Sequence, residues 1–299
     1  MSPLAHAGRT DGDGWVACGC GRRHWGRFGA AGLLLRHGDE VLLQHRALWS
    51  HEGGTWGLPG GARSSAEGAL DGALREAREE AGVPADAVRP RSAWTEDHGA
   101  WSYTTVVATA DERISPAAGD AESLALAWVA VDEVARRPLH PGLASTWSSL
   151  VELSSRSLVI LVDGANVVGS RPDGWWHDRA GAARRLRDGL HRLGHGGVPA
   201  TGLDRASTAG GVSRWWPEIT LVVEGAARGV TGTARVRVED APGSGDDALV
   251  RLAVERRRSR PDDVVVAVTG DRGLRSRLAR ADVPAYGPRW LLGLLDATG

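Results

Sequence analysis

The pattern of apolar and polar positions in the first half of the chain changes between the periods of strands and helices. Two strand-like runs, FGAAGLLLRH and EVLLQ, are joined by a Gly-Asp turn. A highly charged helical pattern follows, and two further β-rich runs lead to a closing helix. The predicted elements are strands at 28–37 and 40–44, a helix at about 67–81, strands at 101–110 and 124–131, and a helix at 143–153. This order predicts an α/β domain.

The second half shows a different pattern, in which continuous apolar runs end at or just before acidic residues. Fully apolar runs are typical of parallel strands buried on both faces. Strands alternate with helical pattern, which predicts an α/β domain with a parallel sheet of the doubly wound kind. The predicted elements are strands at 158–162, 219–223 and 264–268 and a helix at about 245–258.

A short polar connector at residues 154–157 separates the two halves. At 299 residues, the chain has room for about two domains. We therefore expect one domain over residues 1–154, with its core at about 25–153, and a second over 157–299. Each should fold by itself.

Composition narrows the possible chemistry. Hydrophobic residues make up 42% and charged residues 24% of the chain, and no apolar run approaches a membrane span of about 18 residues. Residues 1–14 lack the apolar core of a signal peptide, so we expect a cytoplasmic protein without a membrane partner. All 36 basic residues are arginine, which excludes lysine-dependent catalysis. The net charge of −1 offers no global attraction to nucleic acid.

The segment from Gly61 to Val83 carries the strongest chemical signal. Five residues separate Gly61 from Glu67, and seven more lead to REAREEAGV. On a helix, Glu76, Glu79 and Glu80 share one face. Clustered carboxylates are hard oxygen ligands that suit Mg²⁺ or Mn²⁺. A solvated face with Glu–Arg pairs is the simpler alternative for the helix alone.

This spacing resembles the Nudix box, the signature of Nudix hydrolases, and a Gly/Pro-rich loop enters the helix as in that family. The resemblance, over about residues 25–153, implies an α/β/α sandwich with a mixed sheet. It implies metal binding by Glu76, Glu79 and Glu80, with Glu79 and Glu80 facing solvent, and substrate contacts at the loop. Arg75 would hold a box glutamate by ion pairing. The loop residues are Gly60 and Gly61, and Glu122 is a further candidate metal ligand whose alternative is a surface charge.

Acidic residues at separate strand ends of the second half are expected to converge. Asp163, Asp247 and Asp271 would then form a Mg²⁺ or Mn²⁺ site at the carboxyl edge of the sheet, with Asp246 as a substitute for Asp247. The segments VDGANVVG, SGDDAL and VTGDRGL resemble the NYN (PIN-like) ribonucleases of the YacP-like branch. That resemblance places Asn166, Glu224 and Arg272 at a substrate site. Helix caps are the alternative for these aspartates.

Three smaller signals leave alternatives open. Arginines at 184–187 and 251–260 would track an RNA backbone or simply solvate helix faces. The Trp pairs at 175–176 and 215–216 would stack on bases or anchor the core. Cys18, Cys20 and His24 are one ligand short of a closed zinc site, so reduced thiols are the simpler expectation.

The resemblances together predict a two-domain, metal-dependent enzyme. The first domain would cleave the phosphoanhydride bond of a nucleoside diphosphate linked to X, with a box glutamate or a water activated by the metal as the source of the nucleophile. The second would hydrolyse RNA. The alternative is a nucleotide-sensing Nudix domain that controls an RNA-binding module without turnover. The oligomeric state and the identity of the nucleotide do not follow from the residues.

Overall fold

The computed structural model describes residues 10–119, 122–172, 174–203 and 210–298. Its contacts divide the chain into two compact units. Unit 1 comprises Met1–Ser154 with Gly211–Ser213, and unit 2 comprises Ser155–Gly210 with Arg214–Gly299. Independent folding of 1–154 and 157–299 stays a prediction. Of the segment considered for a signal peptide, residues 1–9 lie outside the described residues.

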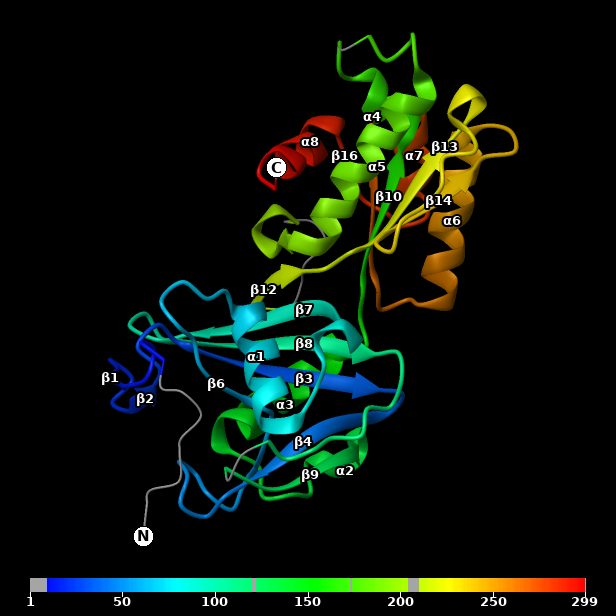
Figure 1. Ribbon diagram of the computed structural model, residues 1–299. Coiled ribbons are helices and arrows are strands. Elements are labelled where there is room, and N and C mark those ends of the chain that lie inside the picture. The colour runs from blue at the N-terminus through cyan, green and yellow to red at the C-terminus, as the bar shows by residue number, and fades with distance from the viewer. Residues whose placement is uncertain (1–9, 120–121, 173, 204–209, 299) are drawn as a thin grey trace. The chain divides into compact units, whose positions relative to one another are not determined.

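Unit 1 is built on a mixed sheet with strand order β7-β8-β3-β4-β5 (Figure 1). β3 runs parallel to β8, whereas β4, β6 and β7 pair antiparallel with their neighbours, and β9 pairs with β4. The strands are β1 (Trp15–Ala17), β2 (Arg23–Trp25), β3 (Ala30–His37), β4 (Glu40–Arg46), β5 (Trp56–Gly57), β6 (Gly60–Ala62), β7 (Val88–Asp97), β8 (Ser102–Ala110) and β9 (Ser123–Ala130). The helices are α1 (Ala69–Ala81), α2 (Val131–Val134) and α3 (Pro141–Ser154).

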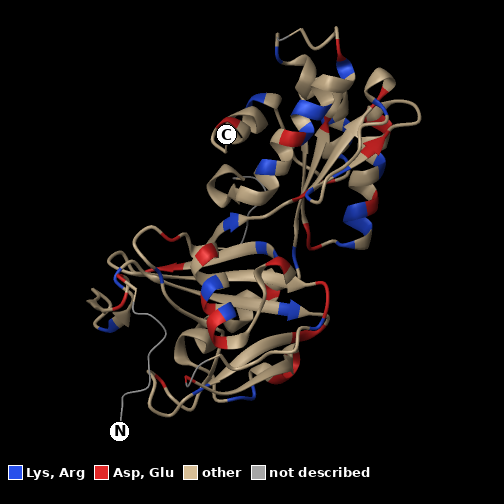
Figure 2. Ribbon diagram, viewed as in Figure 1, with Lys and Arg blue, Asp and Glu red and all other residues tan. Residues whose placement is uncertain are grey.

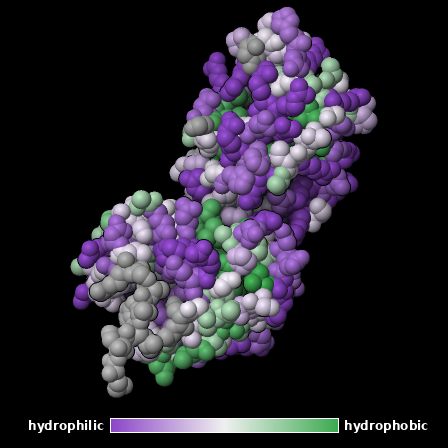
Figure 3. Space-filling view, viewed as in Figure 1, coloured by the Kyte–Doolittle hydropathy of each residue, from purple (hydrophilic) through white to green (hydrophobic). Residues whose placement is uncertain are grey.

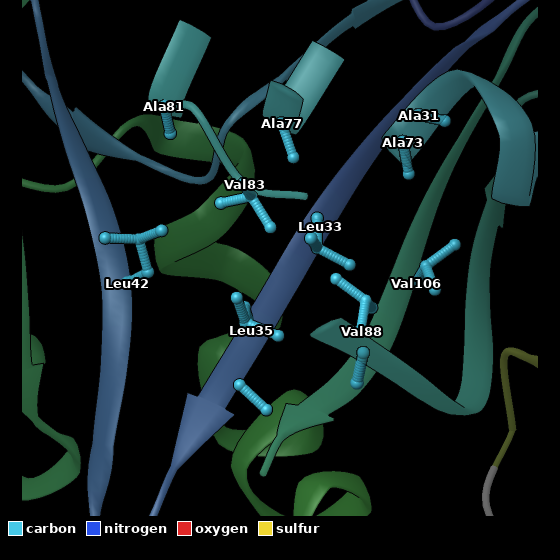
Figure 4. Packing of buried hydrophobic residues seen from close by; sticks show 12 residues of the cluster. Ala31, Leu33, Leu35, Leu42, Ala73, Ala77, Ala81, Val83, Val88 and Val106 are labelled. Carbon is cyan, nitrogen blue, oxygen red and sulfur yellow. The ribbon is translucent and has the colours of Figure 1, made fainter. Parts of the chain in front are cut away.

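Alternation along β3 explains how α1 is held on one face of this sheet. Every second residue of β3 points to α1. These side chains pack against alanines of α1 that are spaced by four residues (Figure 4). Small side chains let the helix approach the sheet closely. α3 lies against β7 and β8. Its apolar residues are not part of the cluster between β3 and α1. The labelled cluster includes Ala31, Leu33, Leu35, Leu42, Ala73, Ala77, Ala81, Val83, Val88 and Val106.

Unit 2 contains a five-stranded sheet of order β14-β13-β10-β15-β16, and all four pairings are parallel. Its helices α5 and α6 lie on either side of the sheet (Figure 1). The strands of this sheet are β10 (Leu158–Asp163), β13 (Glu218–Val223), β14 (Val236–Asp240), β15 (Val264–Val268) and β16 (Ala285–Tyr286). Outside it, β11 (Val198–Pro199) pairs antiparallel with β12 (Val212–Trp215), whose residues are divided between the two units. The helices are α4 (Gly164–Gly169), α5 (Arg179–Gly196), α6 (Gly245–Ser259), α7 (Arg272–Ala279) and α8 (Pro288–Asp296).

The central strand β10 is buried along its whole length, as its apolar sequence requires. Val159 and Leu161 pack with Leu249 of α6 and Leu274 of α7. β13 lies on one side of β10 and β15 on the other, so the strand order reverses at β10. In open parallel sheets, ligands bind in the crevice at the carboxyl ends of the strands beside such a point.

The elements predicted from apolar periodicity are present, with boundaries shifted by a few residues. Several elements were not predicted, above all β7, β14 and the long helix α5. None of the helices in the described ranges combines the length and the hydropathy needed to cross a bilayer. The visible surface is mainly hydrophilic, with hydrophobic residues gathered on parts of unit 1 (Figure 3).

Candidate functional site

The loop from β6 into α1 brings the Gly-rich segment against the charged helix. β6 pairs antiparallel with the start of β3. α1 begins after Gly68 and ends at Gly82, whose φ of 65° is a left-handed conformation that favours glycine. Acidic and basic residues follow one another along α1 (Figure 2). Both ends of the motif are therefore fixed by backbone geometry.

Arg75 organises the acidic side chains of this site. Its guanidinium donates to both carboxylate oxygens of Glu67, at 2.8 and 2.9 Å. It also donates to Glu76 at 2.8 Å, to Glu79 at 3.3 Å and to the Ala62 carbonyl oxygen at 2.9 Å. One cation thus contacts three carboxylates and ties α1 to β6. The expected pairing of Arg75 with a box glutamate is present, and it extends to Glu67.

Glu76 and Glu80 are held with little access to water. Burial raises the pKa of Glu76 to about 7, partly offset by Arg75. Glu80 is only 4% exposed, and burial followed by repulsion from Glu76 raises its pKa to about 8. The Gly60 amide donates to Glu80 at 2.8 Å. The expectation that Glu80 faces solvent is therefore wrong, whereas the Glu79 side chain is 37% exposed.

These carboxylates fit a hard divalent cation. Burial disfavours the charged carboxylates of Glu76 and Glu80, and their mutual repulsion adds to this free-energy cost. A bound cation would lower that cost. Arg75 binds Glu67 through both carboxylate oxygens, and the assignment of Glu76, Glu79 and Glu80 as metal ligands stays a prediction; all three offer carboxylate oxygens. The donor set is therefore the one that Mg²⁺ or Mn²⁺ prefers.

Gly61 must lack a side chain for this arrangement to form. A Cβ built on Gly61 would lie 2.7 Å from the Glu76 carboxylate, closer than van der Waals contact allows. We expect Gly61→Ala to displace Glu76 and to weaken Mg²⁺ binding by about tenfold or more, since an outer contact that orients a ligand is worth about 10–100-fold. Titration with Mg²⁺, followed calorimetrically, measures this change.

Gly57→Ala is the matched control for that substitution. A Cβ on Gly57 meets its nearest neighbour at 3.7 Å, an ordinary contact, and Gly57 lies on the preceding strand β5, which pairs with β4. The control should bind Mg²⁺ as the unchanged protein does. Equal affinities in the two variants would show that Gly61 does not shape the site.

Gln44 is a site residue that the sequence patterns did not reveal. It is fully buried on β4, contacts Glu80 and donates to the Ser123 hydroxyl at 2.8 Å. A polar residue at the end of the apolar run EVLLQ was the available signal. Glu122 directly precedes Ser123, and its carbonyl oxygen accepts from the Ala47 amide at 2.7 Å. The metal role of the Glu122 side chain stays a prediction.

In unit 2, Asp163, Glu224 and Asp271 stand at or just after the carboxyl ends of β10, β13 and β15, and Asp246 lies in the first turn of α6. Asp163 accepts from the Asn166 amide at 3.0 Å and from the Thr269 hydroxyl at 2.8 Å. Burial raises its pKa, and the charges of Asp246 and Glu224 raise it further. Burial likewise raises the pKa of Asp246, followed by repulsion from Asp271. These electrostatic links connect Asp163, Asp246, Asp271 and Glu224.

The remaining predicted residues of unit 2 divide between this cluster and its surroundings. Asn166 accepts from the Gly270 amide at 2.7 Å and so joins α4 to the segment between β15 and α7. Asp247 instead forms an ion pair with Arg277 at 2.6 Å, and its side chain is 71% exposed. Asp246 is thus better placed than Asp247 for the cluster. Arg272 is exposed at the start of α7.

Helix capping accounts for part of the same pattern. Asp163 caps α4, and Asp271 caps α7 by accepting from the Leu274 amide at 2.7 Å. Asp246 is not a cap, because Ser244 holds the N-cap position of α6. The capping alternative is therefore confirmed for Asp163 and Asp271 and wrong for Asp246.

The basic and aromatic clusters of unit 2 are largely structural. Arg251 pairs with Glu239 at 2.6 Å, and Arg256 with buried Asp263 at 2.6 Å. Trp215 and Trp216 are 2% and 6% exposed. They are core anchors, and the base-stacking role considered for this pair is wrong. Trp176, in contrast, is 55% exposed.

Comparisons with known proteins place unit 1 in a family. The model of the NUDIX domain matches residues 26–148. A Mycobacterium tuberculosis protein named "Putative 8-oxo-dGTP diphosphatase 3" is 52% identical over 153 residues, which cover 48% of this chain and 70% of that protein. The chain therefore belongs to the Nudix family, as its box predicts. An α/β fold with a mixed sheet agrees with this membership.

Two further relatives each match nearly half of the chain. A Bifidobacterium longum "Nucleoside triphosphate pyrophosphatase/Nudix hydrolase fusion protein" is 46% identical over 145 residues, covering 46% of this chain and 30% of that protein. The chain thus spans less than a third of that relative. The crystal structure of RenU, a Nudix hydrolase from M. smegmatis, is 48% identical, with 48% of this chain and 96% of that chain covered and a TM-score of 0.46.

Proposed function

We propose that unit 1 hydrolyses a phosphoanhydride bond in a nucleoside diphosphate linked to X. The observation that carries this proposal is the group of glutamates on one face of α1. Arg75 holds them beside β6 by donating to Glu67, to Glu76 and to the Ala62 carbonyl oxygen. Membership of the Nudix family supports it. The names of the relatives support a nucleoside triphosphate, including an oxidised purine, as the substrate class to test first.

Each residue of the face has a distinct task in this proposal. A bound Mg²⁺ or Mn²⁺ would supply Lewis-acid stabilisation of the diphosphate. Glu76 and Glu80 hold their carboxylates in place through Arg75 and through the Gly60 amide. Glu79, the most exposed of the three, is positioned to accept a proton from an attacking water. The substrate contacts expected at Gly60 and Gly61 stay a prediction, because both residues pair with β3 and the Gly60 amide already donates to Glu80.

A screen of nucleotides tests this proposal directly. Nucleoside triphosphates, 8-oxo-dGTP, dinucleoside polyphosphates and nucleotide sugars are incubated with the full chain and Mg²⁺ or Mn²⁺. We expect at least one class to release a nucleoside monophosphate product. A protein that binds these nucleotides but turns none of them over would favour the sensor alternative, in which unit 1 controls unit 2.

We further propose that unit 2 is a PIN-like domain that hydrolyses RNA with the help of Mg²⁺ or Mn²⁺. The specific observation in favour is the electrostatic coupling that links Asp163, Asp246, Asp271 and Glu224 beside the point where the strand order reverses. Asp163 would contribute its carboxylate as a metal ligand while Asn166 and Thr269 orient it. The parallel sheet supports this fold class.

Two adjacent aspartates offer a matched test of this second activity. We expect Asp246→Asn to lower Mn²⁺-dependent cleavage of single-stranded RNA by about 100-fold or more, as loss of a group that positions the metal should. Asp247→Asn removes only an exposed ion pair with Arg277, worth about 0–1 kcal/mol, and should retain activity.

Both substitutions are introduced into the full chain carrying Glu79→Gln, so that hydrolysis by unit 1 does not contribute. Similar losses in the two variants would remove the distinction between Asp246 and Asp247. If the parent chain binds RNA without cleaving it under any divalent metal, the binding-module alternative holds and the nuclease proposal fails.

A further inference from the structure

A second cluster of metal-ligating side chains lies apart from the carboxylate sites. The ligand atoms of Cys18, Cys20, His24 and His98 all lie within 4.8 Å of one another. The sequence suggested three ligands, because His98 stands far along the chain from the others. The fold supplies the fourth by placing the loop between β7 and β8 against the hairpin β1–β2.

The hairpin places both thiols on one side. Cys18 and Cys20 stand two residues apart in the turn after β1, and the turn brings both Sγ atoms within 4.8 Å of each other. The Cys18 amide donates to the Arg22 carbonyl oxygen at 3.0 Å, and Gly21 closes the turn with a φ of 81°. β2 then returns His24, whose Nε2 lies 3.2 Å from Cys20 Sγ.

The fourth side chain is brought in from the body of unit 1. The His98 amide donates to the Trp101 carbonyl oxygen at 2.9 Å in the turn between β7 and β8. The Trp101 ring stacks on His24 at 4.1 Å, and its Nε1 donates to the Trp25 carbonyl oxygen at 3.0 Å. Trp101 therefore holds the hairpin and orients the His24 ring beside His98.

We propose that Cys18, Cys20, His24 and His98 form a tetrahedral structural zinc site. Two thiolates and two imidazoles are a donor set that Zn²⁺ takes in structural sites, and four protein ligands leave no open position for catalysis. With Zn–S near 2.3 Å and Zn–N near 2.0 Å, tetrahedral ligands stand roughly 3.3–3.8 Å apart. Side-chain shifts of about 1 Å bring the cluster to that spacing.

A metal site would stabilise the short hairpin formed by β1 and β2. β1 and β2 have three residues each, and a two-stranded hairpin of that size is marginally stable in water. A metal bridge to His98 would join this segment to the sheet of unit 1. Asp11, earlier in the same segment, accepts from the Ser65 amide at 3.1 Å in the loop that leads to the Nudix helix. The bridge would thereby also steady that loop.

The test begins with the metal content of the full chain. We expect one zinc per chain after purification under reducing conditions, with two sulfur and two nitrogen neighbours in X-ray absorption. Co²⁺ replacing the zinc should give the visible spectrum of a tetrahedral site with thiolate charge transfer. A zinc-free chain that does not take up zinc, an octahedral Co²⁺ spectrum, or a Cys18–Cys20 disulfide in reducing buffer would overturn the proposal.

Substitutions then distinguish this site from the Nudix carboxylates. His98→Ala should weaken zinc binding by more than about 100-fold, beyond the loss expected for an outer-shell change. It should also increase hydrogen exchange in β1 and β2. His51→Ala is the control, because the His51 ring packs on Trp15 at 5.3 Å but lies outside the four ligands.

Glu79→Gln should keep its zinc. Zinc that survives in His98→Ala but disappears in Glu79→Gln would assign the metal to the Nudix helix and refute the Cys/His site. Because X-ray absorption is measured on the unchanged protein, the proposal can be judged even if His98→Ala fails to fold.

Discussion

Replacing either Glu79 or Glu80 with glutamine is expected to lower kcat for nucleotide hydrolysis by about 10²- to 10⁴-fold, the range that a positioned acid–base or metal-binding group supplies. The reason is the loss of anionic ligands from the face that Arg75 organises. KM should change much less than kcat, because the lost contacts act on the reacting phosphate. Steady-state kinetics with the substrate found by the nucleotide screen measure both constants.

The same two substitutions should leave the fold nearly unchanged. Glu79 is partly exposed, and glutamine is the neutral isostere of a Glu80 whose pKa of about 8 already favours protonation at pH 7 without metal. In Glu80→Gln the side-chain carbonyl oxygen still accepts from the Gly60 amide. The free energy of unfolding should therefore change by less than about 1 kcal/mol. Undiminished turnover in either variant would remove that residue from the catalytic machinery.

Arg75→Met is expected to lower the free energy of unfolding of unit 1 by about 3 kcal/mol, since removing one partner of a buried ion pair leaves the others uncompensated. Glu67 and Glu76 are each 15% exposed in their side chains and would lose their cation. Mg²⁺ should restore part of the loss by neutralising Glu76. Hydrogen exchange at β6 and α1, measured with and without Mg²⁺, reports the change locally.

Arg78→Met is the control for the Arg75 prediction. Arg78 lies on the same helix but on its exposed side, where substitutions usually change stability by less than about 0.5 kcal/mol. Equal exchange rates in the two variants would mean that the Arg75 contacts contribute no net stability. A loss in Arg75→Met that Mg²⁺ does not reduce would place the stabilising effect at Glu67 alone.

The apolar periodicity predicted much of the fold. The helical period also indicated that Glu80 is buried, which the sequence-based assignment of a metal ligand did not take into account. Glu80 follows Ala77 by three residues and Ala73 by seven, so it lies next to the buried face of α1. The expectation of a solvent-facing ligand rested on the helix face that Glu80 shares with Glu76 and Glu79. What the helical period does not reveal is how Gly60 and Gln44 compensate the buried carboxylate, because both lie on other strands.

Other residues could not be assigned without the tertiary structure. His98 reaches the cysteines only through the turn that Trp101 holds. Asp246 and Asp247 are neighbours on one helix, and their different surroundings depend on Arg277 of α7 and on the carboxylates of other strand ends. The strand β7 was missed since VRPRSAWTED mixes charged residues, a proline and small residues.

The position of β10 in the middle of its sheet has a consequence for how the chain is synthesised. β10 pairs with β13 through Val159 and Glu218 and with β15 through Leu158 and Val264. Its wholly apolar face stays without partners on the ribosome until those later strands emerge, whereas nearly all pairing of unit 1 precedes residue 154. Such long-range parallel pairing closes slowly. A ribosome that stalls before residue 264 would therefore present an apolar strand without its β15 partner, a species prone to aggregation.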